Sequence, residues 1–142
     1  MAATPRYAEV TVGQQLPELV LRVRRVDLVR YAGASGDFNP IHWNQRVAQQ
    51  VGLPDVIAHG MLTMALAARA LTDWVSDPGR VLDYGVRFTR PVPVPDDDSG
   101  AQLRVTGVVS ELLEGGCVRV ELTATCGEAK VLGAARATVR LG

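Results

Sequence analysis

The segment from Val81 to the end of the chain constrains the fold most strongly, because apolar and polar side chains alternate along most of it. Such alternation indicates β-strands with one buried face. Short connections at 114–116 and 127–129 predict hairpins, and successive strands joined in this way form an antiparallel sheet. A further alternating strand is expected around Leu19–Val23. The C-terminal strands are predicted to begin at Val81 and then to cover 102–113, 117–126 and 130–141. In the first of them the alternating apolar residues are Leu82, Tyr84, Val86 and Phe88.

Gly60–Val75 is predicted to form the one long helix of the chain. Its apolar residues cover nearly every face, and a helix of this kind is buried. A length of 142 residues with 47% hydrophobic side chains suits a single domain over 1–142. We therefore predict an α+β fold in which a curved antiparallel sheet of about five strands wraps a long buried helix. Because such a sheet has exposed edges, a homodimer or a heterodimer with a related subunit is expected.

Two shorter helices are expected ahead of the long one. Asp27 is a plausible N-cap for the first, and Gly33 and Gly36 are expected to end it. The second is predicted over about Asn44–Val51, with Gly52 as its C-terminal stop.

Charge and hydropathy argue against several classes of function. Lys plus Arg and Asp plus Glu both number 15, a balance that gives no footprint for binding nucleic acid or an anionic membrane. Gly60–Val75 is shorter than the roughly 20 residues of a membrane span and carries Arg69 and Asp73. With no apolar leader in Met1–Val10, a cytoplasmic location is expected.

Cys117 and Cys126 are the only cysteines, and they fall about 30 Å apart on one predicted strand. A disulfide needs Cα atoms within about 7 Å, so both are predicted to be unpaired thiols. No cluster of Cys and His has the spacing of metal ligands, and no metal site is predicted.

The segment "GDFNPIH" is the clearest candidate for chemistry. Asn39 is expected to cap a helical turn that begins at Pro40, and His42 then takes the third helical position. Asp37 lies just outside this turn, and a compact turn can aim its carboxylate and the imidazole at one point. The alternative is a purely structural turn, because Asp, Asn and Pro are all common turn residues.

The second histidine of the chain, His59, directly precedes Gly60 at the start of the long helix. A helix N-terminus offers free N–H groups and the positive end of the helix dipole. A glycine there lets a ligand approach closely, which suits negative charge that develops on a carbonyl oxygen. A carboxylate, an imidazole and a helix N-terminus together favour proton transfer next to a carbonyl.

The stretch "YAGASGDFNPIHWNQRVA" resembles the hydratase 2 motif of MaoC-like (R)-specific enoyl-CoA hydratases and dehydratases. The later "AHGML" is similar to the start of the central helix in that family. The segment "VRFTRPVPVPDD" and the chain length resemble the catalytic B-type subunit of (3R)-hydroxyacyl-ACP dehydratases, which form heterodimers. The resemblance covers most of the chain and implies the hot-dog fold, in agreement with the alternation. The positions that match the motif are Gly36, Asp37, Asn39, Pro40, His42 and Ala48.

The resemblance implies reversible addition of water to a trans-2-enoyl thioester of CoA or acyl carrier protein, which gives a (3R)-3-hydroxyacyl thioester. We assign His42 as the base for the C2 proton and Asp37 as the acid for the C3 hydroxyl, and the reverse allocation stays open. Asn39 would orient the loop, and the N–H of Gly60 would polarise the thioester carbonyl. This chemistry requires no metal and no redox cofactor.

Four further residues are weaker candidates for substrate binding. His59 either touches the substrate or braces the loop. Trp43 either walls the pocket or packs into the core, and core packing is the better prediction. Arg87 and Arg90 are candidates for the phosphates of CoA or of a phosphopantetheine arm, although isolated strand arginines are more often only solvated.

Two other functions stay open from the sequence. A hot-dog thioesterase would share the fold, but hydrolysis needs a carboxylate that activates water at the carbonyl, and nothing favours that over the hydratase motif. A non-catalytic acyl-binding or partner subunit would have no need of Asp37, Asn39 and His42.

Overall fold

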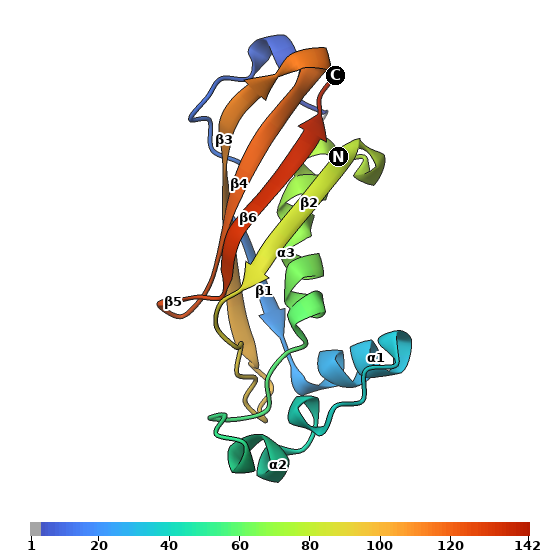
Figure 1. Cartoon of the computed structure of the whole chain (residues 1–142), viewed down its shortest axis with the longest axis vertical. Coiled ribbons are helices and arrows are strands. Elements are labelled where there is room, and N and C mark those ends of the chain that lie inside the picture. The colour runs from blue at the N-terminus through green and yellow to red at the C-terminus, as the bar shows by residue number, and fades with distance from the viewer. Residues whose placement is uncertain (1–3) are drawn as a thin grey trace.

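Six antiparallel strands form one sheet, and a single long helix, α3 (Gly60–Val75), lies along it (Figure 1). The computed structural model describes residues 4–142. The strand order is β1-β3-β4-β6-β2, and the two-residue strand β5 pairs with β4. The predicted antiparallel arrangement is therefore confirmed, with one short strand more than expected. The strands are β1 (Leu19–Val23), β2 (Val81–Phe88), β3 (Ala101–Leu113), β4 (Cys117–Cys126), β5 (Ala129–Lys130) and β6 (Leu132–Arg140).

The remaining helices are short, and the segment that carries both shorter α-helices lies beside the start of α3 (Figure 1). The α-helices in it are α1 (Arg25–Ser35) and α2 (Gln45–Gln50). The 3-10 helices of the chain are η1 (Tyr7–Glu9), η2 (Pro40–His42), η3 (Pro78–Arg80) and η4 (Glu114–Gly116).

The core lies between the sheet and α3. Alternate residues of β3 and β4 are buried, as the period of two predicts, and they meet buried side chains of α3 such as Leu71 and Trp74. One glycine is required by this packing. A Cβ at Gly107 would lie 3.0 Å from the side chain of Leu122 and 3.1 Å from that of Leu16, so a side chain there would displace both leucines by a few tenths of an ångström.

Helix α3 has the predicted bounds, but the prediction that it is buried on every side is wrong for the single chain. Met61, Ala65, Arg69 and Asp73 are exposed, and their spacing of four residues places them on one stripe. A sheet covers only one side of a helix, so the opposite stripe remains open to solvent. Arg69 and Asp73 form an ion pair on this stripe, 3.6 Å apart.

The start of α1 also differs from the prediction. Its N-cap is Arg24, and Asp27 lies in the first turn, where its carboxylate accepts a hydrogen bond from the Arg24 N–H at 2.8 Å. Asp27 therefore supplies the reach-back half of a capping box. Gly36 ends the helix in the left-handed region, at φ 75°, as predicted, whereas Gly33 lies within the helix.

The two edges of the sheet are β1 and β2, and β2 is the more exposed. Its pairing with β6 is interrupted by two register shifts, so its alternating apolar residues do not all face the core. Tyr84 and Val86 are half-buried, whereas Leu82 and Phe88 are exposed. An exposed apolar edge strand agrees with the expectation that a second subunit covers this surface.

Two predictions about the whole chain can be compared with the structure. Cys117 and Cys126 lie at opposite ends of β4 and are both free thiols, as predicted. Within residues 4–142 no helix has the length and hydropathy needed to cross a membrane. The cytoplasmic location stays a prediction.

Candidate active site

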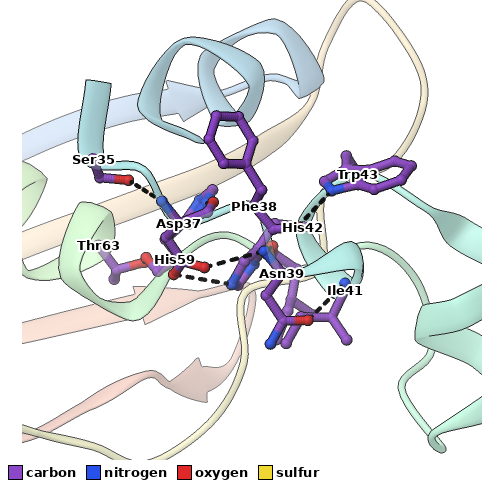
Figure 2. Close-up of polar contacts among 10 residues, drawn as sticks. Ser35, Asp37, Phe38, Asn39, Ile41, His42, Trp43, His59 and Thr63 are labelled. Carbon is purple, nitrogen blue, oxygen red and sulfur yellow. Dashed lines mark hydrogen bonds and ion pairs between the residues drawn. The ribbon is translucent and has the colours of Figure 1, made fainter. Parts of the chain in front are cut away.

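The loop after α1 is shaped by its own polar side chains (Figure 2). The side chain of Asn39 caps η2 by accepting a hydrogen bond from the Ile41 N–H at 3.2 Å. Asp37 accepts from the Asn39 N–H, also at 3.2 Å, and donates its own N–H to the hydroxyl of Ser35. Pro40 occupies the first helical position and His42 the third, as the sequence predicts.

This turn brings the side chains of Asp37 and His42 together. The distance from Asp37 Oδ2 to His42 Nε2 is 3.9 Å. That distance exceeds a good hydrogen bond, so both atoms remain able to bind a third group placed beside them. The Asp37 side chain is 51% exposed and that of His42 only 8%, so an open carboxylate faces a sheltered imidazole.

The tautomer of His42 follows from its second nitrogen. Nδ1 lies 2.7 Å from the carbonyl oxygen of Ile57. Because a carbonyl oxygen only accepts hydrogen bonds, Nδ1 must carry the hydrogen, and the lone pair of the neutral ring is then on Nε2. The nitrogen that faces Asp37 is therefore the one able to take up a proton.

His59 stands behind this pair. Its ring stacks on that of His42, with centroids 3.8 Å apart and an interplanar angle of 22°. Its Nε2 lies 3.1 Å from the main-chain oxygen of Asp37. The rings of His59 and Tyr31 are in an edge-to-face arrangement, with their centroids 4.7 Å apart. Burial lowers the pKa of His59 below its ordinary value, because removing the ring from water disfavours the charged form.

A cavity of about 360 Å³ opens beside the catalytic candidates at the start of α3. The residues that line it include His42, Gly60, Thr63, Phe88 and Arg90. The first N–H groups of a helix have no acceptor within the helix, so those at Gly60 and the next residues are available to a ligand. The cavity therefore joins an imidazole to a helix N-terminus.

The absence of a side chain at Gly60 matters for this cavity. A Cβ there would lie 3.2 Å from two ring carbons of Phe88. The aromatic ring thus packs directly over the helix start, which is the close approach that a glycine permits.

The structure brings together five of the residues predicted from the sequence, which are Asp37, Asn39, His42, His59 and Gly60. Arg90 lines the cavity, whereas Arg87 is exposed on β2 outside the lining residues.

The prediction of core packing for Trp43 is wrong. The residue is 52% exposed and does not line the cavity. Its indole N–H donates to the main-chain oxygen of Phe38 at 3.0 Å, so the ring lies over the outside of the loop that holds Asp37. The indole N–H therefore finds its acceptor in a loop carbonyl at the surface and not in the core.

Ile57, Tyr31 and Phe88 are among the residues of the site that were not anticipated from the sequence. Ile57 contributes a main-chain carbonyl, which any residue supplies, so no side-chain signal exists for it. Tyr31 belongs to a helical pattern and Phe88 to an alternating strand pattern, and such patterns predict only which face of an element is buried. Their roles depend on which elements meet at the start of α3.

The side chains of Asp37, His42 and His59 also contain atoms that ligate metals, and these lie within 4.8 Å of one another. Two of the four imidazole nitrogens already donate to backbone carbonyls, so only one nitrogen of each ring and the carboxylate of Asp37 remain as possible ligands.

The fold and the site define a domain in which an antiparallel sheet packs on one long helix and a carboxylate–imidazole pair lies beside the start of that helix. Comparison with known proteins gives its family. Residues 7–126 match the family model described as MaoC like domain. The chain belongs to this MaoC-like family, and its solved relatives confirm the hot-dog fold.

Two curated relatives carry names of hydro-lyases. One is "3-hydroxyacyl-thioester dehydratase X" of Mycobacterium tuberculosis, 43% identical over 79 residues, which are 56% of this chain and 27% of that protein. The other is "(R)-specific enoyl-CoA hydratase" of Rhodospirillum rubrum, 31% identical over 106 residues, which cover 74% of this chain and 72% of that protein. The chain thus spans about a quarter of the first relative and most of the second.

Solved structures show the same architecture. A "MaoC-like dehydratase" superposes with a TM-score of 0.94 at 42% identity, and the match covers 99% of this chain and 43% of that one. The ChsH1-ChsH2 complex from Mycobacterium tuberculosis contains a chain that matches with a TM-score of 0.75 at 25% identity, over 93% of this chain and 97% of that one.

Proposed function

We propose that this protein catalyses the reversible hydration of trans-2-enoyl thioesters to (3R)-3-hydroxyacyl thioesters. The observation that carries the proposal is the 3.9 Å separation of Asp37 Oδ2 and His42 Nε2 beside the N-terminus of α3. The (R) configuration is supported by the relative named as an (R)-specific hydratase. Fatty-acid metabolism is the expected setting.

In the dehydration direction, His42 Nε2 takes the proton from C2 while protonated Asp37 gives a proton to the C3 hydroxyl. The C3–O bond breaks, the C2–C3 double bond forms, and water leaves. In hydration, Asp37 takes a proton from the attacking water and His42 returns a proton to C2. General acid–base groups of this kind each contribute roughly 10²–10⁴ to the rate.

The lone pair on His42 Nε2 supports this allocation, because the ring needs no rearrangement before it accepts a proton. The reverse allocation uses the same two atoms. Both allocations require one protonated and one unprotonated member of the pair, so a bell-shaped pH–rate profile is expected for either.

The N-terminus of α3 would stabilise the negative charge that develops on the thioester oxygen when C2 loses its proton. The Gly60 N–H is our candidate donor, because Gly60 lines the same cavity as His42. Removing such a donor costs about 10²–10³ in rate in known enzymes. Arg90, which also lines the cavity, is a better candidate than Arg87 for a phosphate of CoA or of the carrier-protein arm.

We further propose that a second hot-dog subunit completes the assembly. The exposed apolar side chains of Met61 on α3 and of Leu82 and Phe88 on β2 support an interface there. A second copy and a related subunit are both compatible with it. Light scattering on this chain purified alone should give twice its mass if the partner is a second copy, and its single mass if the partner is a related subunit.

The test is to mix the purified protein with a trans-2-enoyl-CoA and follow loss of the conjugated enoyl absorbance. Wild type should consume the substrate and form the (3R) product, whereas Asp37→Asn and His42→Ala should lose at least about 10² of the rate. Asp96→Asn, which makes the same chemical change in an exposed loop, is the matched control and should be unaffected.

Two outcomes would replace the proposal. Release of free thiol instead of loss of the enoyl group would identify a thioesterase. Absence of turnover over a range of chain lengths, on both CoA and acyl carrier protein and with a hot-dog partner supplied, would leave an acyl-binding subunit.

A further inference from the structure

His59 occupies the centre of the site without lining the cavity. Only 1% of the residue is exposed, and it is absent from the side chains that border the open space. Figure 2 shows its ring next to His42 and beneath the loop that carries Asp37. A side chain so enclosed has no surface left for substrate, so any role in the reaction must pass through the residues it contacts.

The contacts of His59 determine its protonation pattern. Its Nε2 lies 3.1 Å from the main-chain oxygen of Asp37, which can only accept, so Nε2 carries a hydrogen. In His42 the hydrogen is on Nδ1, which faces the oxygen of Ile57. The two stacked rings therefore hold opposite tautomers.

A proton on the remaining nitrogen of His59 would be poorly accommodated. Among the described residues, His59 Nδ1 is buried and has no hydrogen-bond partner. Protonation there would bury an N–H donor without an acceptor, which is unfavourable. The titratable groups that face the ring are His42, Asp37 and Tyr31.

The reaction itself adds a second reason for a neutral ring. When His42 takes up the C2 proton, it becomes a cation whose ring centroid lies 3.8 Å from that of His59. Two positive rings at that distance would repel each other, whereas a neutral ring does not oppose the charge on its neighbour. Burial acts in the same direction on the pKa of His59.

We infer that His59 is a positioning residue for the reaction: as a neutral imidazole, it holds the Asp37 main chain through Nε2–H and supports the face of the His42 ring. This inference rests on the proposed function. It explains how the carboxylate and the base keep their separation although the Asp37 side chain is half exposed. One buried side chain thereby aligns both reacting groups.

The first test needs no substitution. The chain contains only two histidines, so an imidazole ¹H–¹⁵N spectrum of the full-length protein contains two spin systems, which His42→Ala assigns. We expect the Nε2–H tautomer for His59 and the Nδ1–H tautomer for His42 at pH 7, with His59 mostly neutral at pH 6.5 because burial lowers its pKa below that ordinary value. A His59 ring with its hydrogen on Nδ1, or one that is mostly charged at pH 6.5, would overturn the inference.

The second test uses a matched pair of substitutions. The amide nitrogen of His59→Gln reaches the position of Nε2 and can donate to the Asp37 carbonyl, whereas that of His59→Asn reaches only the position of Nδ1. Misplacing reacting groups by about 1 Å can cost about 10²-fold in rate. We therefore expect kcat to fall about 10²-fold in His59→Asn and roughly tenfold less in His59→Gln, with KM within about threefold of wild type in both.

The outcomes separate the inference from the function on which it depends. Wild-type kcat in both variants would overturn the positioning role, and a rise in KM at unchanged kcat would mean that His59 touches the substrate. If the variants do not fold, the tautomers measured in the wild-type protein decide. If wild type turns over no enoyl thioester while both tautomers are as expected, the proposed reaction fails and the assigned geometry of the two rings stands.

Discussion

Replacement of Gly60 by alanine separates the role of the α3 N-terminus in catalysis from its role in stability. The added Cβ would lie 3.2 Å from two ring carbons of Phe88, so that ring must move by a few tenths of an ångström. Phe88 is 55% exposed and can rotate toward solvent. Alanine is favoured over glycine within a helix by up to about 1 kcal/mol, which offsets the contact. The free energy of unfolding should therefore change by less than about 1 kcal/mol.

Activity should respond far more strongly than stability. Gly60 lines the cavity shared with His42, so the new methyl group enters the space in which we place the thioester carbonyl. A shift of the reacting atoms by about 1 Å can cost about 10²-fold in rate, and we expect kcat/KM on a trans-2-enoyl-CoA to fall by about that factor. Urea unfolding measured on the same preparation gives the stability change.

The matched control for this substitution is Gly33→Ala in α1. Nothing lies within 4 Å of a Cβ built at Gly33, and the residue is within the helix, so the variant should gain up to about 1 kcal/mol of stability at unchanged activity. If Gly60→Ala kept wild-type kcat/KM and wild-type stability, the thioester carbonyl could not lie against the start of α3, and the assigned role of its N–H groups would be refuted.

Four further results are expected. Asn39→Ala removes the cap of η2 and should cost about 1 kcal/mol in urea unfolding, with a loss of kcat that Asn39→Asp largely avoids. Arg90→Ala should raise KM by no more than about fivefold, since an exposed ion pair contributes at most about 1 kcal/mol, and Arg87→Ala should raise it less, because only Arg90 lines the cavity. Leu71→Ala, at a fully buried position of α3, should destabilise the protein by about 2–5 kcal/mol in the same assay. Because burial lowers the pKa of His59, the unfolded chain binds a proton at a higher pH than the folded chain does. The contribution of His59 to the free energy of unfolding is therefore complete above the ordinary pKa of 6.5 and decreases as the pH falls below it. Unfolding curves from pH 8 to pH 5 should show this loss in wild type and less of it in His59→Gln.

The sequence predicts the local half of the site well, because a turn is determined by its own residues. Asn39 caps η2 and Pro40 starts it for reasons contained in three consecutive positions. The distance between Asp37 and His42 is short for the same reason, since a single turn separates them. The strand bounds also follow closely from the period of two, because each strand of the sheet buries one face.

The remainder of the site depends on contacts between distant segments. The oxygen that sets the His42 tautomer comes from Ile57, and every residue type carries the same carbonyl. Trp43 is hard to place from the sequence for a different reason. Its large apolar ring favours the core, but its indole N–H donates to a main-chain oxygen at the surface of the loop. In α3, apolar residues on all sides predict burial, but periodicity does not distinguish a face that this chain covers from one, such as that of Met61, that it leaves exposed.

The two groups proposed to react lie within one short segment, but two main-chain carbonyls that take no part in the reaction determine which ring nitrogen of each histidine carries a hydrogen. The oxygen of Ile57 fixes the hydrogen of His42 on Nδ1 and leaves the lone pair on Nε2, which faces the carboxylate, and the oxygen of Asp37 fixes the hydrogen of His59 on Nε2. A change that moves the main chain at 57 away from His42 would therefore remove the contact that fixes this tautomer, while the side chains of Asp37 and His42 remained in place. It follows that the turn "GDFNPIH", placed in another loop, would reproduce the spacing of the two groups without the contact that leaves the lone pair on Nε2.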